Sequence, residues 1–172
     1  LTDAGEVSAK GEEISHVQFD SFRHTAGAER KVFAQTWEYM MNRIEQAIEE
    51  HGTADAYGCY VWSGAEARIF RHLASKHAGK VGIPSIDEVE AFITNQVIDQ
   101  LETARALVFP AESYSIKKIA NHIGFEWPMA DASGANSTLW YARAVDGEPK
   151  ELRESYRSMV RSYNQADTMA QV

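Results

Sequence analysis

The chain has 172 residues, of which 44% are hydrophobic and 24% charged, and its formal net charge is −8. This size allows one domain with a sizeable core, and the composition excludes wholesale disorder. The apolar runs are too short for a membrane-spanning helix, and the chain shows no export signal. The single cysteine, Cys59, excludes an internal disulfide framework and is typical of a reducing cytosol, so we expect a cytoplasmic protein.

The first half of the chain predicts strands alternating with helices. His16–Phe22 alternates as a half-buried strand does. A helix over Ala28–Glu50 follows, with apolar residues every three or four positions, and Gly52 ends it. Ala56–Trp62 is aromatic and β-prone, which predicts a second strand, and Ala65–His77 predicts a second helix. The inward positions of this second helix are Ile69, Phe70 and Leu73.

The middle of the chain carries clear helix-start signals. Ser85 and Glu88 form a capping box for a short helix that runs to about Thr94. Val97–Asp99 then leads into a helix that ends near Pro110. This order predicts a short extended segment between two helices.

The last third of the chain is predicted to be helical with one long loop. Ser115 caps a helix that Gly124 closes, and its inward side is Ile116, Ile119, Ala120 and Ile123. Residues 127–137 are loop-like, a helix covers Thr138–Val145, and a long final helix starts from Pro149. Few strands interleaved with many helices favour an α/β layer fold.

The final helix places an acid on its apolar side. Residues at spacings of four, four and three form one stripe, namely Leu152, Tyr156, Val160 and Tyr163. Asp167 continues this stripe by four more residues, where a carboxylate is costly unless it is paired or bound to a metal. The alternative is that the helix frays at this point and Asp167 meets solvent.

The other side of the same helix carries a basic stripe, made of Lys150, Arg153, Arg157 and Arg161. Such a stripe can follow a phosphate backbone. Glutamates are interleaved with it, however, which favours a solvated face with helical ion pairs. The overall negative charge also disfavours a nucleic-acid partner, because phosphates bind Lys and Arg.

Two further acids occupy unusual positions. Glu66 shares the inward face of its helix, although a Glu in the first turn also gains from the helix dipole. Asp99 is read either as a site acid or as a helix cap with Glu102 as its box-like partner. Together with Asp167, these carboxylates fit the oxygen ligands of two divalent ions that act on a phosphodiester.

Several motifs carry a family resemblance. They are Ser113–Lys117 (SYSIK), Gly124–Trp127 (GFEW), Tyr163–Asp167 (YNQAD), and the strand-like Tyr57–Trp62 leading to Glu66. These motifs resemble the C-terminal ribonuclease-H-like domain of the predicted RecB-family nucleases, and the resemblance covers nearly the whole chain. The spacing of Tyr163 and Asp167 is also similar to the third motif of the DEDD exonucleases.

The resemblance implies roles for individual residues. Glu66 and Asp167 would be ligands of two Mg²⁺ or Mn²⁺ ions, and Tyr163 would orient the attacking water. Asp99 would be a further ligand or a nearby acid, and Lys117 would contact a phosphate or pair with one of the acids. Glu29 resembles a structural Glu that opens the long helix in that family.

The sequence also departs from the family pattern. The first strand of the fold should carry an Asp-x-Glu motif, and no candidate for it is found. Because the chain starts at Leu1 and not at Met, we expect a fragment of a longer protein with a RecB-like nuclease domain upstream. Residues 1–172 would form a single ribonuclease-H-like domain, an α/β mixed sheet flanked by helices that lacks its first strand.

The sequence therefore predicts a metal-dependent nuclease, a 3′–5′ exonuclease on DNA or RNA, inactive or nearly so as this fragment alone. One alternative is a non-catalytic ribonuclease-H-like scaffold that binds nucleic acid or a partner nuclease domain. Another is a helical interaction domain, in which Asp99 is only a cap and Asp167 a frayed end.

Other reactive or aromatic side chains are given structural interpretations. His72 and His77 are read as surface residues, because their spacing does not stack them on one helix face for zinc. Trp127 and Trp140 could stack on bases, but they are read as lids over the core. Cys59 is read as a small buried hydrophobe.

Overall fold

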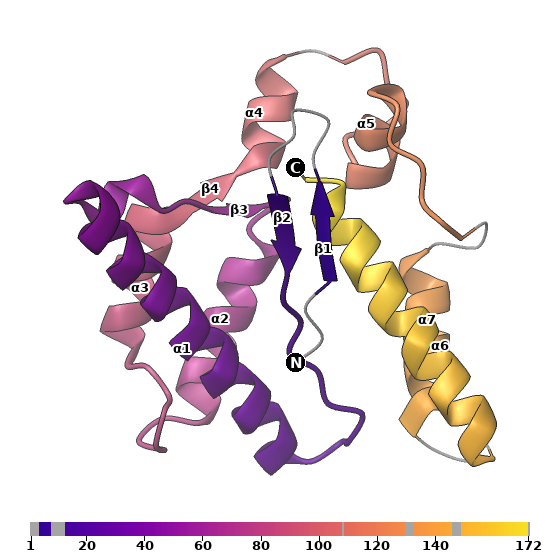
Figure 1. Ribbon diagram of the computed structural model, residues 1–172, viewed down its shortest axis with the longest axis horizontal. Helices are drawn as coiled ribbons and strands as arrows, with labels where there is room; N and C mark the ends of the chain where they lie inside the picture. The colour runs from indigo at the N-terminus through magenta and orange to yellow at the C-terminus, as the bar shows by residue number, and fades with distance from the viewer. Residues whose placement is uncertain (1–3, 8–12, 108, 130–132, 146–148, 172) are drawn as a thin grey trace. The chain divides into compact units, whose positions relative to one another are not determined.

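A computed structural model describes residues 4–7, 13–107, 109–129, 133–145 and 149–171 (Figure 1). The backbone divides into two compact units. We call residues 25–126 with Gln171 the central unit, and the described residues up to His24 with Trp127–Ala170 the terminal unit. No described helix is long and apolar enough to cross a membrane. The single ribonuclease-H-like domain remains a prediction.

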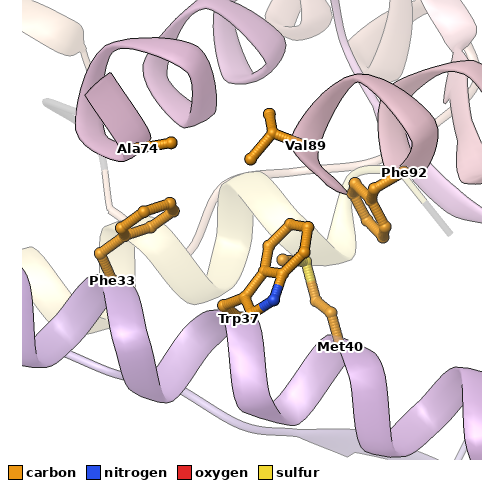
Figure 2. Close-up of a cluster of buried hydrophobic side chains, with 6 residues drawn as sticks. All are labelled: Phe33, Trp37, Met40, Ala74, Val89 and Phe92. Carbon is orange, nitrogen blue, oxygen red and sulfur yellow. The ribbon is translucent and has the colours of Figure 1, made fainter. Parts of the chain in front are cut away.

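The central unit is organised by three helices, α1 (Ala26–His51), α2 (Ala65–Lys76) and α3 (Ile86–Gln96). Figure 2 shows their buried side chains pointing toward one another, namely Phe33, Trp37, Met40, Ala74, Val89 and Phe92. Burial of each large side chain in this cluster contributes about 1.5–3 kcal/mol to the stability of the unit.

Local signals set the helix ends of the central unit. Thr25 caps the start of α1, and Gly52 ends it in the left-handed conformation that glycine adopts without strain. The predicted capping box at the start of α3 is confirmed, because Ser85 and Glu88 bond to each other's backbone N–H. The predicted helices in this part of the chain are confirmed within a few residues.

A small parallel sheet completes the central unit. A short 3₁₀ helix, η1 (Ala54–Ala56), precedes β3 (Cys59–Val61), which pairs with β4 (Val97–Asp99). In the register, Cys59 lies opposite Val97 and Val61 lies opposite Asp99, so both strands end at the same edge. Two short helices follow β4, α4 (Gln100–Ala106) and α5 (Ile116–His122).

The terminal unit contains an antiparallel strand pair, β1 (Ala4–Val7) with β2 (Glu13–His16), and two helices. The helices α6 (Gly134–Val145) and α7 (Lys150–Met169) lie side by side (Figure 1) and run antiparallel. Their core consists of Trp140, Val160 and Tyr163, with partly buried Phe22, Met129, Tyr141, Tyr156 and Met159 around it.

The structure corrects the predicted strand over His16–Phe22. Strand β2 ends at His16, and residues 17–24 form neither helix nor strand. Side-chain contacts hold this segment in place. The Tyr141 hydroxyl donates to the Ser21 carbonyl at 3.0 Å, and the Tyr141 and Phe22 rings pack together. The alternation of apolar and polar residues could not show that aromatic contacts, and not strand-to-strand hydrogen bonds, hold the backbone here.

Some predicted inward positions are wrong. Ile69 is 55% exposed and Ile123 is 66% exposed, and Leu152 is also exposed. Ile69 and Leu152 lie within α2 and α7 but outside their buried faces, and Ile123 follows the last residue of α5, where helical spacing no longer sets the direction of the side chain. His77 was expected at the surface, yet it is only 7% exposed, because it bonds to Glu29 on α1.

The α/β class holds in its coarse form, with helices and a parallel strand pair that are consistent with a ribonuclease-H-like fold. The predicted mixed sheet is not a single sheet among the described residues. These contain two separate two-stranded sheets, one antiparallel and one parallel. The flanking of one sheet by helices remains a prediction.

Candidate carboxylate site

Asp167 lies in the last turns of α7, which continues to Met169. The alternative of a frayed end is therefore wrong. The carboxylate of Asp167 is half-buried, and its Oδ1 accepts a hydrogen bond from the Trp127 indole Nε1 at 2.8 Å. A charged acceptor makes this bond stronger than one between neutral groups. The hydrogen bond from Trp127 thus offsets part of the free-energy cost of burying the Asp167 carboxylate.

Tyr163 lies one turn before Asp167 and is buried in the core of the terminal unit. Its hydroxyl bonds to the Asp167 carboxylate, and its ring meets Trp140 edge-on at 6.2 Å between centroids. Burial, and then the hydrogen bond and charge of Asp167, raise the pKa of Tyr163 to about 12. The phenol therefore stays protonated near neutral pH, where it can donate a hydrogen bond but cannot act as a base.

Trp127 is the residue whose role at this site the sequence interpretation missed, because it was read as a lid or a base-stacking ring. The available signal was the chemistry of the indole, which has one N–H donor and no acceptor. A partly buried indole therefore needs an acceptor nearby. The structure supplies the carboxylate of Asp167.

Asp99 ends β4 in the central unit and caps α4, because its Oδ1 accepts from the Leu101 backbone N–H at 2.9 Å. The predicted cap is confirmed. Asp99 also lies at the carboxyl edge of the parallel pair, and Glu66 follows the same edge of β3. In open α/β sheets, ligands bind outside the carboxyl ends of the strands. Both acids therefore follow an edge suited to a site.

Glu66 lies in the first turn of α2. Its Oε2 is buried and has no hydrogen-bond partner among the described residues. Burial, and then the charge of Glu66, raise the pKa of the Cys59 thiol to about 11. Cys59 is therefore a protonated thiol near neutral pH and not an activated nucleophile, and it is half-buried where full burial was predicted.

A buried carboxylate oxygen without a partner is the kind of oxygen donor that Mg²⁺ and Mn²⁺ prefer as a ligand. Glu66 supplies such an oxygen. Within the described residues, however, no group of three or more His, Cys, Asp or Glu side chains is arranged to hold a metal ion. Lys117, the predicted phosphate contact, is half-buried in the first turn of α5.

Two arginines on the basic side of α7 make contacts within the terminal unit. Arg157 pairs with Glu154 at 2.6 Å, and Arg161 pairs with Asp20 at 2.6 Å. Both guanidinium groups also lie about 5 Å from the centre of the Phe22 ring. The predicted helical ion pair is thus confirmed for Arg157, whereas Arg161 pairs with Asp20, which lies outside α7. Both arginines also contact the Phe22 ring.

Comparison with known proteins gives one family. The family model of the RNase H superfamily matches residues 14–172. No curated protein and no solved structure matches the chain. Since the family match extends over nearly the whole sequence and both units contribute to it, the chain belongs to the RNase H superfamily.

Proposed function

We propose that this chain is a metal-dependent nuclease domain of the cytoplasm, which trims DNA or RNA from the 3′ end. The observation that carries the proposal is the pair of Tyr163 and Asp167 on α7, hydrogen-bonded to each other within a chain of the RNase H superfamily. A carboxylate held on the apolar side of a helix has a cost, and a catalytic role explains why it is kept there.

In this proposal each residue has one task. Two Mg²⁺ or Mn²⁺ ions, when bound, would offset the phosphate charge and lower the pKa of the attacking water. Asp167, Glu66 and Asp99 are the proposed ligands. The protonated Tyr163 hydroxyl would donate a hydrogen bond that orients the water, and Lys117 would contact a phosphate of the substrate.

The proposal also extends beyond these residues. The first-motif carboxylates would come from sequence before Leu1, next to a RecB-like nuclease domain. The chain of 172 residues by itself is then expected to be inactive or nearly so.

The test uses 3′- and 5′-labelled single-stranded DNA and RNA with Mn²⁺ or Mg²⁺. A longer form that carries the natural sequence before Leu1 should trim from the 3′ end only with a divalent ion. Asp167→Asn should remove the activity. Asp20→Asn is the matched control, because it changes a carboxylate of the same unit that pairs with Arg161, and it should leave the rate nearly unchanged. Cleavage that needs no divalent ion, or that survives Asp167→Asn, would contradict the proposal.

A second candidate function is a non-catalytic scaffold that binds nucleic acid or a partner nuclease domain. The absence of a three-membered metal-ligand group among the described residues favours it. Binding of labelled single strands by the longer form, without trimming under any divalent ion, would support the scaffold over the nuclease.

A further inference from the structure

A groove of about 240 Å³ lies between α1 and α3 in the central unit. Its surface is mainly apolar, and two of its lining side chains, Trp37 and Phe92, are drawn in Figure 2. The lining also includes Met41 and Ile44 of α1 and Ala91 and Asn95 of α3. None of these residues belongs to the proposed nuclease site, so a role for the groove is independent of the proposed function.

The apolar surface of the groove continues along α1. A row of side chains at spacings of four, three and four shares one helix face, namely Trp37, Met41, Ile44 and Ile48. Trp37 is 9% exposed, whereas Ile48, at the far end of the row, is 47% exposed. A single exposed apolar residue is ordinary, but a row that leads out of a groove is typical of a surface that a partner covers.

Acidic side chains border this row on α1. Glu38, Glu45 and Glu49 each follow a residue of the row by one position, which places them about 100° further round the helix. All three are exposed. The buried residues of α1, such as Met40, lie on the opposite side of the row, where they pack into the core. The row therefore separates the core of the unit from an acidic border.

Helix α3 supplies a second acidic border. Glu88 lines the groove and Asp87 precedes it, while α3 contains no basic residue. Hydrogen bonds from Ser85 hold the pKa of Glu88 below its ordinary 4.5, so this carboxylate is charged near neutral pH. On α1, the one basic residue between Trp37 and Glu49 is Arg43, which bonds to the Gln46 side chain. The groove is thus an apolar strip with acids on both sides.

We propose that this groove binds a cationic amphipathic helix of a partner protein. Apolar side chains of that helix would enter the strip, as helices do in other apolar grooves, and its Lys or Arg side chains would meet the acidic borders. Charge complementarity of this kind speeds association and selects the partner more than it adds affinity. An anionic partner is disfavoured at this face, because its charges would meet the carboxylates.

The probe is a fluorescein-labelled peptide of Leu and Lys, about 18 residues or five helical turns long, whose Leu side chains form one stripe. Fluorescence anisotropy measures its affinity for the whole chain. A scrambled peptide of the same composition keeps the charge but loses the stripe, and it should bind about tenfold more weakly. Equal binding of the two peptides would mean that charge alone attracts them and would overturn the inference.

Variants with matched controls locate the binding. Ala91→Arg fills the groove and adds a positive charge, so peptide affinity should fall by about tenfold or more. Ala142→Arg adds the same charge at an exposed position of α6 and should change the affinity by less than about twofold. Glu45→Gln should weaken binding by about two- to fivefold, whereas Glu151→Gln, on α7, should not. Thermal unfolding checks that each variant is folded, as expected for exposed positions.

A second measurement needs no substitution. In ¹H–¹³C spectra of the wild-type chain, the peptide should shift the methyl signal of Met41 in the groove and leave that of Met159, in the terminal unit, unchanged. A peptide that binds without moving the Met41 signal occupies another surface, and the inference fails. If sedimentation shows that the wild-type chain dimerises and that Ala91→Arg is a monomer, a second copy of the chain fills the groove and the proposed partner is wrong.

Discussion

Acidic side chains have different kinds of hydrogen-bond partner in the two units of this chain. In the central unit, Asp99 bonds to the backbone two residues away, and Glu29 bonds to Lys76 and His77 to join α1 to α2. These are contacts that stabilise helices and helix pairs. In the terminal unit, Asp167 bonds to Tyr163 and to Trp127, at the edge of a small aromatic core.

The difference separates structural acids from candidate site acids. Asp99 caps a helix and Glu29 forms an ion pair between two helices. These structural roles are enough to explain why an acid stands at each position, without a catalytic role. Asp167, by contrast, accepts hydrogen bonds from an indole N–H and a phenol hydroxyl. The functional argument is therefore stronger for Asp167 than for Asp99. Of the four predictions that follow, the first measures the core of the central unit and the other three test this contrast.

The largest effect is expected in the core of the central unit. Phe92 is 4% exposed and packs edge-on against both Trp37 and Phe70. Phe92→Ala should lower the free energy of unfolding by about 3–5 kcal/mol, because it removes apolar contacts and leaves a cavity. Urea denaturation followed by circular dichroism measures this loss. Ile69→Ala, at an exposed position of α2, is the control and should cost far less.

The next effect concerns the site in the terminal unit. Tyr163→Phe keeps the ring against Trp140 but removes the hydroxyl that bonds to Asp167. If that hydroxyl positions the site, divalent-dependent trimming by the longer form should fall by about 10–100-fold. The free energy of unfolding should change by only about 1 kcal/mol, the worth of one hydrogen bond. If the trimming rate of Tyr163→Phe falls no more than its loss of stability explains, Tyr163 is a core residue without a role in the site.

Asp99 offers a sharper separation of roles. Asp99→Ala should cost about 0.5–2 kcal/mol of stability, because α4 loses its cap. Asp99→Asn should keep most of that stability, since Asn caps helices as well as Asp does. Thermal denaturation of the two variants measures the cap. Trimming that is lost in Asp99→Asn, with stability retained, would show that the charge of Asp99 also serves the site, whereas retained trimming would leave Asp99 a cap alone.

The smallest effect comes from Glu29. Hydrogen bonds from Lys76 and then His77 lower the pKa of Glu29 below its ordinary 4.5, so the folded chain binds this proton less readily than the unfolded chain. The stabilisation is therefore present above about pH 4.5 and is lost as the pH falls further. Glu29→Gln should cost at most about 1 kcal/mol at pH 7, because the carboxylate is partly exposed and screened.

Unfolding curves of the wild-type chain and Glu29→Gln, measured between pH 7 and pH 3, would follow this difference. The two curves should converge at the acid end of the range. A gap that widens as the pH falls would contradict the assigned pairing.

The resemblance to a ribonuclease-H-like domain could be predicted from the sequence, and the family match confirms it at the level of the superfamily. The Tyr163 and Asp167 pair could also be predicted, because residues four apart lie on one helix face. The bond from Trp127 could not, because nothing local relates residue 127 to residue 167. The burial of the Glu66 Oε2 atom without a hydrogen-bond partner among the described residues could not be predicted either. Hydrophobic periodicity predicts which face of a helix is buried, but not which groups pack against each atom.

The sequence by itself determined where the helices of the central unit lie and how several of them begin and end, whereas α6 begins at Gly134, within the predicted loop. The capping box of Ser85 and Glu88 and the cap at Asp99 join residues at most three apart, so neighbouring residues are enough to specify them. Only the tertiary structure decided that residues 17–24 leave the strand, that His77 is buried against Glu29, and that Trp127 holds Asp167. Each of these depends on side chains from distant segments, whose meeting follows from the packing of whole helices.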